Sequence, residues 1–410
     1  MELMRLIICL LTLAASIAAQ PLPLSTPEKE GLSADRLARL HQRFEQMTKE
    51  GHRAGAITMI VRNGKIADWK AYGYRDIAQR LPMGKDTICR IWSMTKVVTS
   101  VATMMLVEEG KLALDDPVSK YIPELKSLKV LTGGTADRPE LVDAVRPITV
   151  KHLLTHTSGF TYNWGDHPVS ELYRRANIFQ VRSLKEFVQK LGSIPLVAQP
   201  GEKYTYGVSI DVLGYLVEVV SGMPFDKFVA TRILQPLRMN DTSFRLPEEK
   251  LKRLAKTYTI RNGVLSESSP DGLGFPADVP FGGMGLYSTI GDYARFGQML
   301  LNGGQLDGVR LLSRKTVELM MTNHLNHLKT PYIDQNEGYG FGLGGSVRID
   351  LAKGNAPGSL GQFGWDGAAS TSFNIDPKER TVALLFLQHI PYDAPTLKLF
   401  STLFYQAIAD

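Results

Sequence analysis

The sequence predicts a mixed α/β (α+β) fold in which both ends of the chain contribute strands to one antiparallel sheet. Segments rich in β-branched and aromatic residues occur near both termini, at residues 56–62, 67–74, 339–347, 368–375 and 381–388. Between about residues 149 and 290, apolar residues instead recur at helical spacing. We therefore expect a sheet flanked by terminal helices, an inserted and mostly helical lobe, and a cleft between the two.

The composition is that of a folded protein without a nucleic-acid signature. The chain has 410 residues, 44% of them hydrophobic, which suffices for one large or two ordinary domains. The formal net charge is +6, but Lys and Arg are scattered among Asp and Glu and form no long basic run. Such a mildly basic surface gives no reason to expect a nucleic-acid partner.

The N-terminus has the layout of a secretory signal peptide. A barely positive head ends at Arg5, an apolar run extends from Leu6 to Ala15, and small residues follow. Because this run is too short to span a bilayer comfortably, we predict a signal peptide over residues 1–19 and export to the periplasm or the medium. We expect no stable membrane insertion after cleavage; an uncleaved anchor is the alternative. Removal of Cys9 with the leader leaves Cys89 alone, so the mature chain can form no intramolecular disulfide.

A helix and a β-hairpin are the first elements predicted after the leader. Apolar residues recur at helical spacing from Leu37 to Met47, behind a predicted N-cap at Ser33. The dipeptide Asn63-Gly64 then separates two β-rich segments, and this is a strong signal for a two-residue hairpin turn. A further helix starts at about residue 91 and ends near Gly110, a residue suited to the left-handed position after a helix.

The elements in the middle of the chain are less clearly bounded by sequence signals. Residues 126–146 show no periodicity, and we interpret them as an irregular surface insertion. Thr149 is suited to cap a short helix, and further helices are predicted over 184–191, 210–221, 226–235, 289–301 and 395–409. We assign residues 20–92 and 290–410 to the sheet lobe and residues 93–289 to the helical lobe, with the functional site in the cleft.

Ser93 and Lys96 are the first candidate site residues. Side chains three residues apart lie on one helical face, so the Ser93 hydroxyl and the Lys96 amine can lie side by side at a helix N-terminus. An adjacent amine can activate a serine, which is otherwise a poor nucleophile at neutral pH. About one Ser-x-x-Lys is expected by chance in such a chain, and a helix N-cap serine with a solvated lysine is the simpler alternative.

Two further stretches combine turn residues with an aromatic side chain. Tyr206 follows the Pro200-Gly201 turn and directly precedes a predicted helix. Trp365 lies in a segment rich in small residues, 361–371, that opens into a predicted strand. Either aromatic residue could instead be an ordinary packing residue, which is the commoner role.

Together these stretches resemble the serine β-lactamase and penicillin-binding-protein superfamily. Ser93-Met-Thr-Lys96, Tyr206 in Pro-Gly-x-x-Tyr-x-Tyr, and Trp365-Asp366-Gly367 resemble its three motifs, in the expected order and over nearly the whole mature chain. The resemblance is greatest to the family VIII carboxylesterases, which are related to class C β-lactamases. It implies a β-lactamase/transpeptidase-like fold and an acyl-enzyme mechanism.

Two departures from the β-lactamase pattern bear on the substrate. Val208 stands where that pattern has Asn, and Trp365-Asp366-Gly367 stands where it has Lys-Thr-Gly. Without that lysine, we expect neutral or apolar acyl esters to be preferred to anionic lactams. Asp366 also departs from the Trp-Gly-Gly usual in the esterases.

The resemblance implies a role for each candidate residue. Ser93 would attack the ester, Lys96 and Tyr206 would act as a coupled general base, and the backbone N–H groups of Ser93 and Ala368 would form the oxyanion hole. The side chains expected to contact substrate are Trp365, Asp366, Gly367, Trp92, Phe160 and Trp164. His156 is expected to be structural, and Asp211 to make a hydrogen bond at its helix start. We expect no cofactor and no metal.

The predicted function is therefore a serine carboxylesterase that acts on short-chain acyl esters, with a small-molecule ester as partner. A β-lactamase, a D-alanyl-D-alanine carboxypeptidase, an amide hydrolase and a non-catalytic peptidoglycan-binding relative remain alternatives. The sequence has no Gly-x-Ser-x-Gly and no His-Glu-x-x-His, which disfavours an α/β-hydrolase and a metal hydrolase. The oligomeric state is open.

Overall fold

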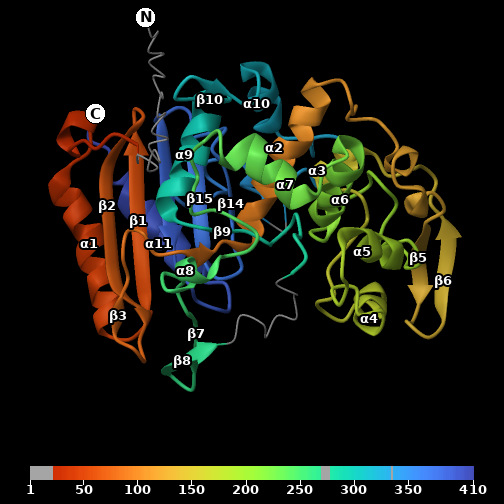
Figure 1. Ribbon diagram of the computed structural model, residues 1–410, viewed down its shortest axis with the longest axis horizontal. Helices are drawn as coiled ribbons and strands as arrows, with labels where there is room; N and C mark the ends of the chain where they lie inside the picture. The colour runs from red at the N-terminus through yellow and green to blue at the C-terminus, as the bar shows by residue number, and fades with distance from the viewer. Residues whose placement is uncertain (1–21, 269–277, 334–335) are drawn as a thin grey trace, which may run out of the picture.

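A computed structural model describes residues 22–268, 278–333 and 336–410 of the chain (Figure 1). The predicted signal peptide, residues 1–19, lies outside the described residues. Within the described part, no helix is both long and apolar enough to cross a lipid bilayer.

One eight-stranded antiparallel sheet joins the two ends of the chain, as predicted. Its strand order is β12-β13-β14-β15-β16-β1-β2-β3. The strands from the two ends meet where β1 pairs with β16, in a register that runs from Ile57 opposite Phe386 to Arg62 opposite Thr381. The strands are β1 (Gly55–Arg62), β2 (Lys65–Asp76), β3 (Leu81–Pro82), β12 (Tyr339–Phe341), β13 (Ser346–Arg348), β14 (Phe363–Asp366), β15 (Thr371–Asp376) and β16 (Thr381–Phe386).

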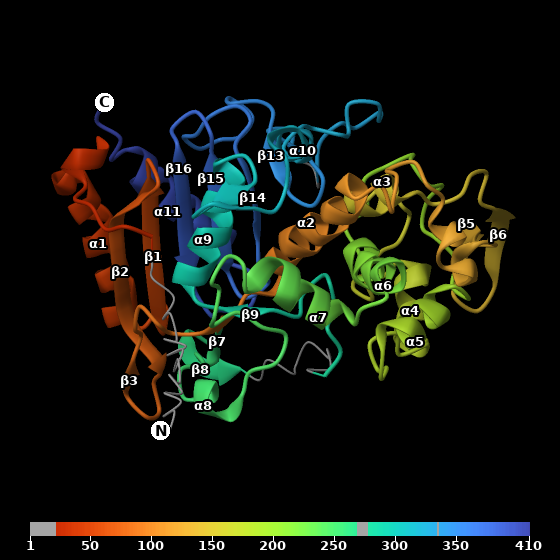
Figure 2. The ribbon, with the colours of Figure 1, turned by 45° about the horizontal axis from the view of Figure 1, so that its top comes forward.

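Helices cover both faces of this sheet. On one face α1 (Ala34–Lys49), whose N-cap is Ser33, packs with α11 (Ala394–Tyr405), and the rings of Phe44 and Phe400 meet at 6.3 Å. On the other face α9 (Ile290–Leu301), capped by Thr289, lies against β16. Figure 2 shows α1 and α9 on opposite sides of the strands. The predicted terminal helices are therefore confirmed.

A mostly helical region lies beside the sheet, with α2 between the two (Figure 2). Helix α2 is buried along nearly its whole length, which fits its continuous run of apolar and small residues. The α-helices of this region are α2 (Thr95–Glu108), α3 (Val150–Leu154), α4 (Pro168–Arg175), α5 (Leu184–Leu191), α6 (Ser209–Ser221) and α7 (Phe225–Val229). The short helix α8 (Glu248–Leu251) lies on the sheet side of the molecule (Figure 2), and α10 (Arg314–Met320) lies near the last strands. A π-helical turn, Ala230–Leu234, continues α7, and 3-10 turns cover Glu28–Glu30, Trp92–Met94, Val118–Lys120 and Pro123–Leu125.

Several predicted elements differ from the structure. Residues 126–146 are not irregular: they contain a hairpin of β5 (Lys129–Gly134) and β6 (Pro139–Asp143). All five residues of β6 are exposed, so this strand lacks the alternation of apolar and polar residues that would reveal it. The single strand expected over 339–347 is two strands, β12 and β13, because the chain reverses at Gly344, where φ is 98°.

Three further strand pairs were not predicted. A hairpin of β7 (Thr257–Arg261) and β8 (Val264–Ser268) turns at Asn262-Gly263. The other two pairs have two residues in each strand: β4 (Cys89–Arg90) with β9 (Tyr287–Ser288), and β10 (Gln305–Leu306) with β11 (Val309–Arg310). Strands of two residues carry no readable periodicity, whereas Asn262-Gly263 is the same turn signal as Asn63-Gly64.

Candidate active site

Ser93 and Lys96 lie at the start of α2. Ser93 is in the preceding 3-10 turn, and Lys96, fully buried, is in the first turn of α2. The Lys96 amine lies 3.1 Å from Ser93 Oγ, 3.0 Å from the Tyr162 hydroxyl and 2.8 Å from the Gly283 carbonyl oxygen. An ammonium group has three N–H donors, so each has an acceptor here. The predicted i, i+3 proximity of Ser93 and Lys96 is present.

Tyr206 completes the predicted group. Its hydroxyl oxygen lies 2.8 Å from Ser93 Oγ, although the two residues are 113 positions apart in the chain. The indole N–H of Trp365 donates to the same oxygen at 3.3 Å, and the Lys96 amine lies 4.9 Å from the centre of the Tyr206 ring. An N–H donor and a lysine side chain therefore both lie beside the Tyr206 ring and hydroxyl.

Tyr162 is a further site residue that the sequence did not reveal. Burial, with Tyr206 and Asp211 nearby, raises the pKa of its hydroxyl well above the usual value, so the hydroxyl is neutral at physiological pH. Trp164 stacks on the Tyr162 ring at 4.3 Å with an interplanar angle of 15°. The contact to Lys96 spans 66 residues, and no local pattern around Tyr162 points to it.

Asp211 supports the other side of Lys96. Its Oδ1 accepts the N–H of Gly283 at 2.8 Å, and the carbonyl of the same residue accepts from Lys96. Burial raises the pKa of Asp211 to about 6, an effect that the charge of Lys96 opposes. A Cβ at position 283 would lie 2.4 Å from Asp211 Oδ2, so this contact requires glycine. Asp211 therefore does more than bond at its own helix start.

The turn between β14 and β15 rests on the segment that leads into Ser93. The N–H of Gly367 donates to the Thr371 carbonyl at 2.7 Å. A Cβ at Gly367 would lie 2.2 Å from Thr371 Oγ1 and 2.4 Å from the Ile91 carbonyl oxygen. In the described residues, the N–H of Ala368 has no hydrogen-bond acceptor. The oxyanion roles of the Ser93 and Ala368 N–H groups stay predictions.

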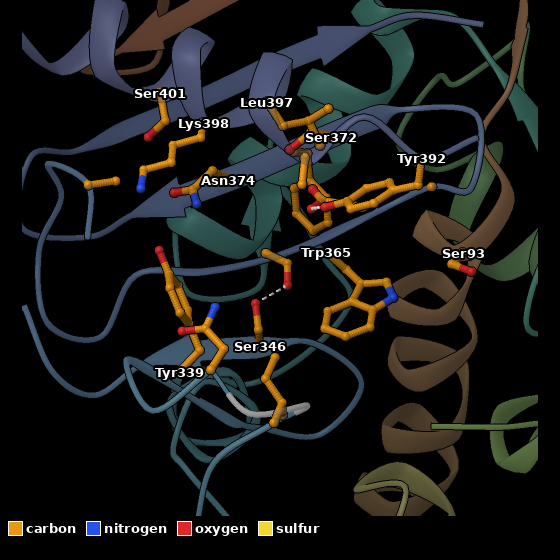
Figure 3. A pocket seen from close by; sticks show the side chains of 18 of the residues that line it. Ser93, Tyr339, Ser346, Trp365, Ser372, Asn374, Tyr392, Leu397, Lys398 and Ser401 are labelled. Atoms are coloured by element: carbon orange, nitrogen blue, oxygen red, sulfur yellow. Dashed lines mark hydrogen bonds between the residues drawn. The ribbon is translucent and has the colours of Figure 1, made fainter. Parts of the chain in front are cut away.

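Ser93 opens into a cavity of about 670 Å³ that extends toward α11 (Figure 3). Tyr206, Trp365, Asp366, Gly367 and Ala368 line it, and so does Trp164, whose side chain is half exposed. Four of the six residues expected to contact substrate therefore line the cavity: Trp365, Asp366, Gly367 and Trp164.

Trp92 and Phe160 lie elsewhere. They are 1% and 0% exposed and are not among the residues that line the cavity. Trp92 has a φ of 47°, and its ring packs 3.9 Å from the Arg90 guanidinium carbon. Phe160 is enclosed in the main apolar core. Proximity in sequence to a site residue did not determine where these aromatic side chains point.

His156 packs in an aromatic cage behind Tyr206. Its ring centre lies 4.9 Å from that of Tyr206, 5.4 Å from that of Phe341 and 5.9 Å from that of Tyr204. Complete burial lowers the pKa of the imidazole well below its usual value, so the ring is neutral. Neither ring nitrogen has a hydrogen-bond partner among the described residues. The contacts are those of a packing residue.

Comparison with known proteins identifies the family. The family model described as "Beta-lactamase" matches residues 40–396. The chain belongs to the β-lactamase family. Esterase EstB of Burkholderia gladioli is 30% identical over 88% of this chain and 92% of its own, and protein Rv1367c of Mycobacterium tuberculosis is 38% identical over 85% and 89%. The structure of EstCE1, described as a hydrolase with promiscuous acyltransferase activity, superposes with a TM-score of 0.77 at 27% identity, covering 92% and 99% of the chains. This β-lactamase-family protein is a serine hydrolase.

Proposed function

We propose that the protein is a serine carboxylesterase that hydrolyses short-chain acyl esters through an acyl-enzyme on Ser93. The observation that carries the proposal is the position of Ser93 Oγ, 3.1 Å from the Lys96 amine and 2.8 Å from the Tyr206 oxygen, at the wall of a cavity. The similarity to esterase EstB supports the choice of an ester as substrate.

In the acylation step, Ser93 Oγ attacks the carbonyl carbon and its proton moves to the coupled base. Lys96 in its ammonium form donates to all three acceptors and favours a phenolate at Tyr206, which takes the proton. The N–H groups of Ser93 and Ala368 stabilise the oxyanion. Collapse of the tetrahedral intermediate expels the alcohol, which receives the proton from Tyr206.

In deacylation, Tyr206 removes a proton from water, which attacks the acyl carbonyl, and the proton returns to Ser93 Oγ as the acid leaves. Trp365 donates to the Tyr206 oxygen and so stabilises the charge that this residue carries. Because an aromatic residue stands here where the β-lactamases have a lysine, we expect neutral esters to be preferred to anionic lactams.

The test compares mature protein with its Ser93→Ala variant on p-nitrophenyl acetate, butyrate and octanoate and on a chromogenic cephalosporin. We expect ester hydrolysis to exceed lactam opening, and the substitution to reduce ester kcat by at least roughly 10³-fold. A folded Ser93→Ala enzyme with near-wild-type turnover would refute the mechanism. Faster lactam than ester turnover would favour the β-lactamase alternative, and failure of a covalent serine probe to label Ser93 would favour a binding protein.

Acyl transfer to an alcohol is a second candidate function. The cavity extends well beyond Ser93, and EstCE1 is described as having promiscuous acyltransferase activity. An added alcohol would then compete with water for the acyl-enzyme. The measurement is the ratio of new ester to free acid as the alcohol concentration rises; a ratio of zero at all concentrations argues against transfer.

We also propose that the protein is exported, on the basis of the predicted signal peptide over residues 1–19. The N-terminal sequence of protein recovered outside the cytoplasm tests this proposal. A start near residue 20 supports cleavage, and an intact Met1 supports an anchor.

A further inference from the structure

The cavity has a second end, away from Ser93, that is rich in hydrogen-bond donors. Figure 3 shows Lys398, Ser401, Asn374 and Tyr339 around this end, with Trp365 between them and Ser93. Among the described residues, none of these four side chains has a hydrogen-bond or ion-pair partner. An ammonium, an amide and two hydroxyls therefore face one space with free donors.

The strand register and the helix period bring these groups together. Asn374 lies opposite Gly364 in the strand register, and Ser372 lies opposite Asp366. These two pairs are two residues apart on each strand, so they share one face of the β14–β15 pair. Lys398 and Ser401 are three residues apart and share one face of α11. Gly364, which has no side chain, also lines the cavity.

The charge of this end is positive. Lys398 is the only basic residue among the described residues that line the cavity, and Asp366 is the only acidic one. Asp366 already accepts a hydrogen bond from the Tyr392 hydroxyl at 2.5 Å. Within the described part of the chain, no carboxylate forms an ion pair with Lys398.

We propose that Lys398, Asn374, Ser401 and Tyr339 form a subsite for a carboxylate carried by the substrate at a distance from the scissile bond. The inference rests on the proposed esterase function and refines its substrate class. The reacting ester is neutral, as Trp365 at the reacting centre requires, and the remote end of the same molecule is anionic. Half-esters of dicarboxylic acids and esters of carboxylated alcohols have this chemistry.

The experiment uses matched pairs of charged and neutral substrates. For the acyl side these are p-nitrophenyl half-esters of adipic, suberic and sebacic acid and their methyl esters; for the alcohol side, 4-acetoxybenzoate and its methyl ester. Wild type, Lys398→Met and Lys398→Glu are compared by the kcat/KM ratio within each pair. Lys185→Met is the control, because Lys185 is exposed on α5, away from the cavity, and forms no ion pair with any described residue.

In at least one series we expect Lys398→Met to lower the ratio of charged to neutral substrate about tenfold, mainly through KM, and Lys398→Glu to lower it further. Lys185→Met should leave every ratio unchanged, and hydrolysis of p-nitrophenyl butyrate should stay within twofold in all variants. Equal ratios in wild type and both Lys398 variants, in both series, would overturn the subsite. Ser93-dependent butyrate hydrolysis would then still support the esterase, whereas its absence from wild type would refute the proposed function itself.

Discussion

Replacement of Tyr162 by Phe tests whether this residue holds Lys96 in its working position. The substitution removes one hydroxyl, 3.0 Å from the Lys96 amine, in a place from which water is excluded. It retains the ring that stacks on Trp164. One N–H of a buried ammonium then loses its acceptor.

The size of the effect follows from the charge on the donor. A hydrogen bond to a charged group contributes about 1.5–3 kcal/mol, and each ~1.4 kcal/mol of lost transition-state stabilisation is about tenfold in rate. We therefore expect kcat for p-nitrophenyl butyrate to fall roughly 10- to 100-fold in Tyr162→Phe. KM should change less than about threefold, since the cavity wall formed by Trp164 keeps its support.

Tyr258→Phe is the matched control. This substitution also removes a buried tyrosine hydroxyl, which accepts a hydrogen bond from the N–H of Ile77 at 2.7 Å. Tyr258, however, does not line the cavity. The substitution should lower the melting temperature and leave kcat unchanged. Wild-type kcat in Tyr162→Phe, or an equal loss of kcat in both variants, would show that Tyr162 does not position Lys96.

Two further predictions concern the Trp365-Asp366-Gly367 motif and the loss of stability at acid pH. Gly367→Ala places a Cβ within 2.4 Å of the Ile91 carbonyl oxygen and should lower kcat at least about tenfold. In the control Gly291→Ala the nearest atom would lie at an ordinary 3.7 Å, so kcat should be unchanged. Equal kcat in the two variants would contradict the reasoning. Hydrogen bonds from Asn63 and Ser25 lower the pKa of Glu30 from 4.5 to about 2. Because this folded pKa lies below the unfolded one, Glu30 contributes stability that is present above pH 4.5 and lost as pH falls toward 2. Melting temperatures between pH 7 and pH 2 should fall less steeply in Glu30→Gln than in wild type, and parallel curves would refute the assignment.

The parts of the fold that could be predicted from the sequence are those set by local patterns. Asn63-Gly64 specifies a hairpin turn because both residues accept positive φ, and the structure has φ of 54° and 77° there. Thr149 and Thr289 cap helices through their own side chains, which a sequence shows directly. The β5–β6 hairpin was missed because β6 buries nothing and so has no apolar face to reveal it.

The candidate site divides in the same way. Ser93 and Lys96 are close because a helix makes them so, whereas Tyr206 was predicted through the resemblance of its loop to a known motif. The contacts of Tyr162 with Lys96 and of Asp211 with Gly283 could not be predicted, because they join segments 66 and 72 residues apart that only the folded chain brings together. Trp92 shows the converse: its place beside Ser93 in sequence suggested the cavity, but its backbone conformation turns it into the core.

These long-range contacts explain how a lysine can be fully buried beside the nucleophile. An ammonium in the interior is costly unless every N–H is paired and its charge is compensated. Val208, two residues after Tyr206, is apolar and offers Lys96 no acceptor, and the Tyr162 hydroxyl supplies one from a different loop. Asp211 compensates the charge from the far side of the Gly283 peptide, because its carboxylate accepts the Gly283 N–H while the Gly283 carbonyl accepts from Lys96. A cation held in this way stays fixed beside the Tyr206 oxygen and is not free to follow an anionic substrate, which leaves recognition of any substrate charge to residues farther along the cavity.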